Sequence, residues 1–159
     1  MGQGSAEIPG VFTVTRPQTP LIAADAIIEL IDRPGRPIVL IERRNPPLGW
    51  ALPGGFVDLG ERVERAAVRE ALEETDLRVT LRGLLGIYSD PARDPRGHTV
   101  TAVYVAEARG EPRALDDARA LGVFGLDDLP RPLAFDHALV LADYRNYRAT
   151  GSPAPLRLA

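Results

Sequence analysis

The sequence predicts an α/β protein in which a mixed β-sheet lies between helices, as an α/β/α sandwich. Two observations favour this fold. Strand-like apolar runs and helical segments follow one another in the order strands, helix, strands, helix. The 159 residues, 45% of them apolar and 26% charged, are also enough to bury the core of one domain.

The chain divides into an arm, a domain and a tail. Residues 1–19 are rich in Gly, Pro, Thr and Gln, and only Val11, Phe12 and Val14 hint at a short strand. We expect a flexible N-terminal arm here, which could lie across a partner subunit. Residues 20–148 form the predicted domain, and residues 149–159 are expected to be a frayed C-terminal tail.

Two strands open the domain. The segment 21–31 is apolar at alternating positions and at most positions between them, which is typical of a strand covered on both faces. A turn containing Pro34 and Gly35 ends it, and the segment 37–41 resumes as a second strand. This pattern predicts a hairpin.

The second half of the domain is mainly strands. The segment 77–88 reads as a strand, with Gly83 and Gly86 as expected bulges or points of close approach. Three further elements are then expected: a strand at 99–108, a short strand at Val123, Phe124 and Leu126, and a closing helix at 134–148.

A short helix between these halves carries a cluster of carboxylates and ends near Leu77. Glu70 and Glu74 are four residues apart and Glu73 is three from Glu70, so all three side chains project from one side. The opposite side, which we expect to face the core, carries Val68, Ala71 and Leu72.

Neighbouring carboxylates repel one another unless positive charge lies among them. Mg²⁺ takes oxygen ligands and shares its remaining positions with waters and phosphates, so it suits this cluster. Arg69 can pair with Glu73 and leave Glu70 and Glu74 free for the metal, and the backbone carbonyl of Gly55 could add a ligand. A solvated acidic helix face is the alternative interpretation.

The spacing of these residues closely resembles the Nudix box, the signature of hydrolases that cleave nucleoside diphosphates linked to another moiety. Gly55 is followed by Glu61 after five residues, Arg69-Glu70 follow after seven more, and Glu73-Glu74 complete the pattern. One departure is Asp76, where the family usually has glycine at the helix end. Aspartate tolerates a positive φ better than most residues, so we expect a small local cost.

The resemblance implies a Nudix-type fold, dependence on Mg²⁺ with Mn²⁺ as the alternative metal, and roles for the residues of the box. Glu70 and Glu74 would hold the metal, Glu73 would assist through a water or a direct bond, and Arg69 and Glu61 would brace the helix. The general base could be a box glutamate or an acid of a later loop, where Asp116 and Asp117 are the candidates. A solvated turn is the simpler interpretation of those two aspartates.

Two basic segments are candidates for substrate contacts. Arg43 and Arg44 lie in a loop before the box and could face a diphosphate. Arg93 and Arg96 lie in a proline-stiffened loop after Tyr88, and this loop resembles the branch of Nudix proteins that hydrolyse ADP-ribose. We therefore expect cleavage of ADP-ribose to AMP and ribose 5-phosphate, with Arg93 and Arg96 on the terminal ribose or a phosphate.

The composition limits the kinds of partner and ligand that the protein is expected to bind. A net charge of −3 argues against a nucleic-acid partner, and no apolar run is long enough to span a membrane. The absence of cysteine excludes disulfides and thiolate metal sites, and the N-terminus has no secretory signal pattern, so a cytoplasmic location is expected. A small-molecule nucleotide is the expected ligand, and a homodimer is plausible by analogy.

Two other functions stay open. One is a house-cleaning hydrolase of nucleoside triphosphates, of the MutT kind, which would use the same box. The other is a non-catalytic sensor of ADP-ribose or another nucleotide. Such proteins commonly lose a box acid, whereas all four box glutamates are present here.

Overall fold

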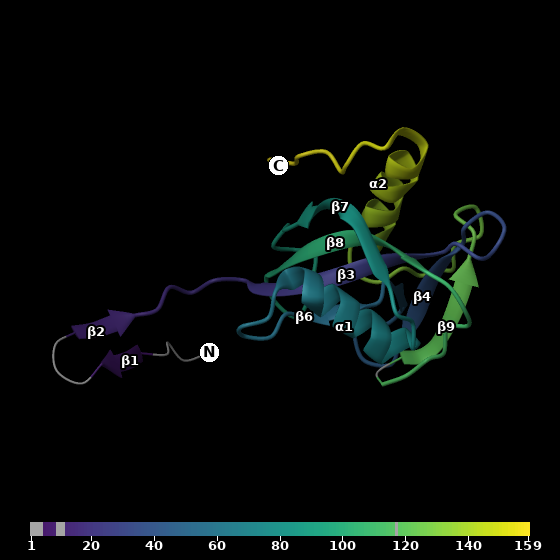
Figure 1. Ribbon diagram of the computed structural model, residues 1–159. Coiled ribbons are helices and arrows are strands. Elements are labelled where there is room, and N and C mark those ends of the chain that lie inside the picture. Colours follow the sequence, from purple (N-terminus) through teal and green to yellow (C-terminus); the bar gives the residue numbers. More distant parts are fainter. Residues whose placement is uncertain (1–4, 9–11, 117) are drawn as a thin grey trace.

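The computed structural model describes residues 5–8, 12–116 and 118–159. Within these residues, a mixed sheet of seven strands lies between two helices, which confirms the predicted sandwich (Figure 1). The sheet consists of β3 (Leu21–Leu30), β4 (Ile38–Arg43), β5 (Trp50–Ala51), β6 (Gly54–Phe56), β7 (Thr80–Tyr88), β8 (Thr99–Ala108) and β9 (Ala118–Phe124). The helices are α1 (Val63–Thr75) and α2 (His137–Thr150).

Strands β3 and β8 form the parallel centre of the sheet, paired from Leu21 with Thr99 to Leu30 with Ala108. Side chains alternate across this pair. Ala26 and Ile28 belong to a core cluster with α1, whereas Ile27 belongs to one with α2. The two apolar layers therefore explain why β3 is apolar at nearly every position.

The predicted hairpin forms, because β3 and β4 are antiparallel neighbours with Glu29 opposite Ile38. The pair then opens, and β6 takes the place of β4 beside the first half of β3, with Gly54 opposite Asp25. This insertion brings the glycines of the box against the central strand. The predicted bulges in β7 also form, since the register with β8 shifts before Gly83 and before Gly86.

Helix α1 ends as the sequence predicts. Asp76 adopts φ 59° and ψ 23°, and its N–H donates to the carbonyl of Leu72. The loop that follows β8 covers this end of the helix, because the N–H groups of Arg113 and Leu115 donate to the carbonyls of Thr75 and Glu74 at 2.8 and 3.1 Å. These bonds satisfy carbonyls that a helix end otherwise leaves free.

Some boundaries differ from the prediction. β9 begins at Ala118 and ends at Phe124, so it starts earlier than expected and leaves Leu126 outside. α2 begins at His137, three residues later than expected, because Phe135 has a φ of 54°, which a right-handed helix does not allow. In the arm, β1 (Ser5–Ile8) and β2 (Phe12–Thr15) pair only with each other among the described strands, and Val11 lies outside the described residues.

The C-terminal tail is anchored, which corrects the expectation that it is frayed. The N–H of Ala154 donates to the carbonyl of Leu85 at 2.8 Å. Arg157 makes two bonds of 2.8 Å to the carboxylate of Asp143, which also accepts a bond from the hydroxyl of Tyr88. The tail therefore closes over the face of the sheet that carries α2.

Candidate active site

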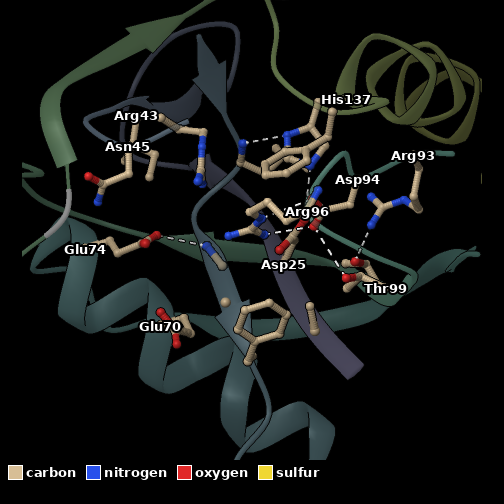
Figure 2. A pocket seen from close by; sticks show the side chains of 18 of the residues that line it. Asp25, Arg43, Asn45, Glu70, Glu74, Arg93, Asp94, Arg96, Thr99 and His137 are labelled. Carbon is tan, nitrogen blue, oxygen red and sulfur yellow. Dashed lines mark hydrogen bonds and ion pairs between the residues drawn. The ribbon is translucent and has the colours of Figure 1, made fainter. Parts of the chain in front are cut away.

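A pocket opens at one end of the sandwich, where three parts of the chain meet (Figure 2). β3 supplies the carboxylate of Asp25, α1 supplies those of Glu70 and Glu74, and β6 lines the pocket beside them with Gly54, Gly55 and Phe56. The last residue of β4 is Arg43, and the loop after it supplies Arg44. The wall is completed by the segment before β8, the first residues of β8 and the segment that leads into α2, with Arg93, Asp94, Arg96, Thr99, Thr101, Phe135 and His137.

Glu74 lies deepest among the acids of the box. It is 9% exposed, and its Oε2 accepts a bond of 2.9 Å from the N–H of Gly54. Burial, together with the charges of Glu70 and Asp25, raises the pKa of Glu74 to about 8. The carboxylate is therefore destabilised as an anion unless a cation compensates it.

The glycines of β6 are required by these carboxylates. A Cβ at Gly54 would lie 1.9 Å from Oδ1 of Asp25, and a Cβ at Gly55 would lie 2.5 Å from Oε1 of Glu70. Any larger residue would push the acids out of the pocket. Glycine here allows close approach of backbone and carboxylate.

Arg69 links the acids of the box, but not in the expected way. Its Nε and one terminal nitrogen bind Glu61 at 2.7 and 2.9 Å, and the other terminal nitrogen binds Glu70 at 2.8 Å and Glu73 at 3.2 Å. The expected pairing with Glu73 is present, but Glu70 is not left free. Arg69 also holds the pKa of Glu61 at about 2, below its ordinary value.

The inward face of α1 also differs from the expectation. Its buried residues include Ala66, Ala67, Ala71 and Glu74, whereas Val68 and Leu72 are only partly buried. Glu74 therefore shares the face that packs on the sheet, where alanines allow the helix to approach closely. Glu73 points outward, with its side chain 45% exposed, and does not line the pocket.

The donor set fits a divalent cation that uses few protein ligands. Within the described ranges, no three Asp, Glu or His side chains converge as a ready-made metal site. Mg²⁺ is commonly held by one or two carboxylates, with waters and substrate phosphates in its other positions. Glu70 and Glu74 supply two carboxylates beside Gly55, and a bound cation would offset the burial and the neighbouring negative charges that raise the pKa of Glu74.

The first pair of arginines faces the acids across the pocket. The Nε of Arg43 donates to the carbonyl of Pro47 at 2.7 Å, and its guanidinium lies 4.8 Å from the ring centre of Phe135. Burial and the nearby charge of Arg96 lower the pKa of Arg43. Arg44 lines the same opening and is exposed. Both positions suit an anionic ligand.

The second pair is bound to the protein itself. Arg93 is buried, with two bonds of 2.9 and 2.7 Å to Asp136 and one of 2.6 Å to Thr101. These bonds anchor Arg93 in the wall of the pocket, and the expected contact with substrate stays a prediction. Arg96 binds Asp94 at 3.0 and 2.8 Å, and its side chain remains 44% exposed at the pocket.

The loop candidates for the general base fall elsewhere. Asp116 is exposed, has a φ of 49° and does not line the pocket, because its loop covers the end of α1. The role of Asp116 as the base stays a prediction that the pocket itself does not support. Asp117 lies outside the described residues.

Asp25 and His137 are buried polar residues of the pocket that were not predicted. Nδ1 of His137 accepts a bond from the N–H of Leu52 at 3.1 Å, so its proton is on Nε2, which lies 3.2 Å from Oδ2 of Asp25. One imidazole thus joins α2, β3 and the segment that leads into β6. The only signal in the sequence was an acid within the apolar run of β3.

Together, the fold and the pocket define an α/β/α protein with a helix-borne acid cluster opposite arginines. The chain belongs to the NUDIX family, because the NUDIX domain profile matches residues 20–144. It is 46% identical over 132 residues to an ADP-ribose pyrophosphatase of Methanocaldococcus jannaschii. The match covers 81% of this chain and 75% of that protein.

Solved structures agree with this assignment. A MutT NUDIX hydrolase of Burkholderia pseudomallei is 39% identical, with a TM-score of 0.69, and the match covers 79% of this chain and 98% of that one. The NUDIX domain of Shewanella oneidensis NrtR, solved in complex with ADP ribose, is 29% identical, with a TM-score of 0.72, covering 84% and 90%. Among the described residues, no helix is both long and apolar enough to cross a membrane.

Proposed function

We propose that this protein is a Nudix hydrolase that depends on a divalent metal and cleaves ADP-ribose to AMP and ribose 5-phosphate. The observation that carries the proposal is that Glu70 and Glu74 line the same pocket as Arg43 and Arg44. The ADP-ribose pyrophosphatase that is 46% identical over most of the chain supports the choice of substrate.

Glu70, Glu74 and the carbonyl of Gly55 would hold the metal, Mg²⁺ or alternatively Mn²⁺. When bound, such an ion neutralises charge on the phosphates and lowers the pKa of a coordinated water. Glu73 lies outside the pocket, so its part in the site is indirect, through Arg69.

The protein groups then have distinct tasks. Arg43 and Arg44 bind and orient the diphosphate, and Arg69 holds Glu70 and Glu61 in place. The oxygen of a water attacks one phosphorus, the phosphoanhydride bond to the other phosphate breaks, and a proton passes from the water to a carboxylate. Because Asp116 lies away from the pocket, the glutamates of α1 are the acceptors that the structure favours.

Product analysis tests this proposal. The pure protein with Mg²⁺ is incubated with ADP-ribose, normal and oxidised nucleoside triphosphates, NADH and diadenosine polyphosphates, each with a chelator control. We expect AMP and ribose 5-phosphate from ADP-ribose, abolished by the chelator. Preferential cleavage of triphosphates would favour the house-cleaning hydrolase instead.

A sensor is the second candidate, because the similar NUDIX domain of NrtR was solved with ADP ribose bound. Binding of ADP-ribose without turnover of any substrate would support it. Against it, Glu61, Glu70, Glu73 and Glu74 are all present.

A homodimer in the cytoplasm, without a nucleic-acid partner, completes the proposal. The net charge of −3 disfavours a phosphate backbone. A two-stranded sheet is marginally stable alone, so β1 and β2 would gain from a second subunit. Light scattering of the full chain, compared with a chain lacking residues 1–19, measures the oligomeric state and the part of the arm in it.

A further inference from the structure

Four planar groups lie one after another at the rim of the pocket. The guanidinium of Arg43 is 4.8 Å from the ring centre of Phe135. The guanidinium of Arg96 lies 5.4 Å from the same ring centre. It also lies 5.3 Å from the ring centre of Phe56. All four residues line the pocket.

Arg96 is held in this arrangement from behind. Its guanidinium makes two bonds to the carboxylate of Asp94, and its backbone N–H donates a third to the same residue at 3.0 Å. Asp94 is 4% exposed, so this anchor is fixed in the wall of the pocket. The guanidinium is therefore presented between two rings in a set orientation.

Phe135 is held just as firmly, in an unusual conformation. Its φ of 54° lies in the left-handed region, which is rare for a bulky residue. The preceding Ala134 bonds through its N–H to the carbonyl of Trp50 at 2.8 Å, and the following Asp136 binds Arg93. Bulky residues kept at such angles cluster at ligand sites, where surrounding contacts enforce them.

Phe56, the last residue of β6, supplies the second ring. It follows Gly55 directly on β6 and is 41% exposed, although apolar rings gain from burial. Its backbone is fixed, because its carbonyl accepts a bond of 3.1 Å from Arg69. An exposed ring on a rigid strand beside the acid cluster is a surface prepared for a planar partner.

We propose that Phe56 and Phe135, with Arg96 between them, form the subsite for the nucleobase of the substrate. The inference rests on the proposed function and adds to it the position of the base. The base stacks on the exposed part of the Phe56 ring beside Arg96, and Phe135 supports the guanidinium of Arg96 from its other side. Every base has a π-face, so the subsite selects for a planar ring and not for one hydrogen-bonding edge.

Two ligands distinguish this subsite from the rest of the pocket. The fluorescent nucleotide 1,N6-etheno-AMP keeps a planar purine but has an altered hydrogen-bonding edge, and stacking quenches its fluorescence. Ribose 5-phosphate has no base, and its binding is measured by inhibition of ADP-ribose hydrolysis. Wild-type protein is expected to bind and quench etheno-AMP.

Phe56→Leu and Phe135→Leu are expected to weaken etheno-AMP binding by roughly tenfold or more and to reduce the quenching, because stacking on an aromatic side chain contributes about that much per base. Inhibition by ribose 5-phosphate should stay within about twofold of wild type. Leu59→Ala, at a fully exposed position before α1, is the matched control. If Phe135→Leu does not fold, Phe56→Leu carries the test alone, since Phe56 is 41% exposed and its truncation disturbs the core less.

Two results would overturn the subsite: unchanged etheno-AMP binding in the folded variants, or an equal loss for ribose 5-phosphate. Either result, with hydrolysis of ADP-ribose intact in the wild type, would leave the proposed function standing. A wild-type protein that neither binds nor hydrolyses these compounds would remove the proposed function and the subsite with it.

Discussion

The surroundings of Glu74 disfavour the charged form of its side chain. It is buried and lies near Glu70 and Asp25, and its anion is stabilised by the backbone N–H of Gly54 and by the charge of Arg43. Its pKa of about 8 follows from burial first and from these charges second. The same residue would be stabilised as an anion by a divalent cation, which explains how an unfavourable site can be retained.

The stability of the metal-free protein should therefore depend on pH through Glu74. Between pH 4.5 and about 8 the folded state keeps a proton that the unfolded state has lost, so stability falls as pH rises. The slope from this group is at most about 1.4 kcal/mol per pH unit. Urea unfolding with a chelator at pH 5.5 and 7.5 measures it.

Glu74→Gln is the comparison for that measurement, because the amide oxygen can still accept the bond from Gly54 and does not titrate. The variant should lose less stability than the wild type over the same interval. Equal pH dependence in both proteins would show that Glu74 ionises normally.

Arg69 determines where Glu70 lies, since one guanidinium spans Glu61, Glu70 and Glu73. Lysine keeps the charge but lacks the planar fork that makes these contacts at once. We expect Arg69→Lys to lower kcat/KM for ADP-ribose by roughly 10–100-fold, as is typical when a group that orients metal ligands is lost. Steady-state kinetics measure this effect.

Arg65→Lys, an exposed position on the same helix, is the control and should have wild-type kinetics. An Arg69→Lys variant with wild-type kcat/KM would contradict the role of Arg69. The spacing of the box identified these residues from the sequence. It did not reveal that Arg69 also binds Glu70, because that contact depends on how the loop with Glu61 returns to the helix.

At the scale of elements, His137 connects α2 by hydrogen bonds to β3 and to the segment that leads into β6. It accepts the N–H of Leu52 and donates to Asp25, and it is 2% exposed. Removing the imidazole would leave a buried donor and a buried carboxylate without partners, each of which is costly.

We expect His137→Ala to reduce the free energy of unfolding by roughly 2–4 kcal/mol, measured by urea denaturation. Leu139→Ala, which removes a half-exposed side chain from the same helix, should cost clearly less. If His137→Ala reduces the free energy of unfolding no more than Leu139→Ala does, the stabilising role of His137 is contradicted.

The elements themselves were largely predictable, for identifiable reasons. Alternating apolar residues located β3 and β8, and glycines marked the bulges of β7. The start of α2 was not predictable, because the φ of Phe135 is imposed by contacts with distant segments. The anchored tail was missed for a similar reason: Arg157 finds Asp143 only in the folded chain.

At the scale of the whole molecule, the sandwich joins segments that are far apart in the sequence. Asp25 on β3, Glu74 on α1 and His137 on α2 meet at one end of the sheet because β3 is central and the helices cover opposite faces (Figures 1 and 2). The box glutamates could be identified from spacing alone. Asp25 and His137 could not, because only the packing of both layers brings them together.

The central claim is that Glu70 and Glu74 make this pocket a metal-dependent site for cleaving ADP-ribose. Its most direct test is kcat/KM for ADP-ribose with Mg²⁺ in wild-type and Glu74→Gln proteins, with circular dichroism to confirm that both are folded. We expect the folded variant to lose more than about a hundredfold, beyond the effect typical of an orienting group. Undiminished kcat/KM in the folded variant would contradict the claim.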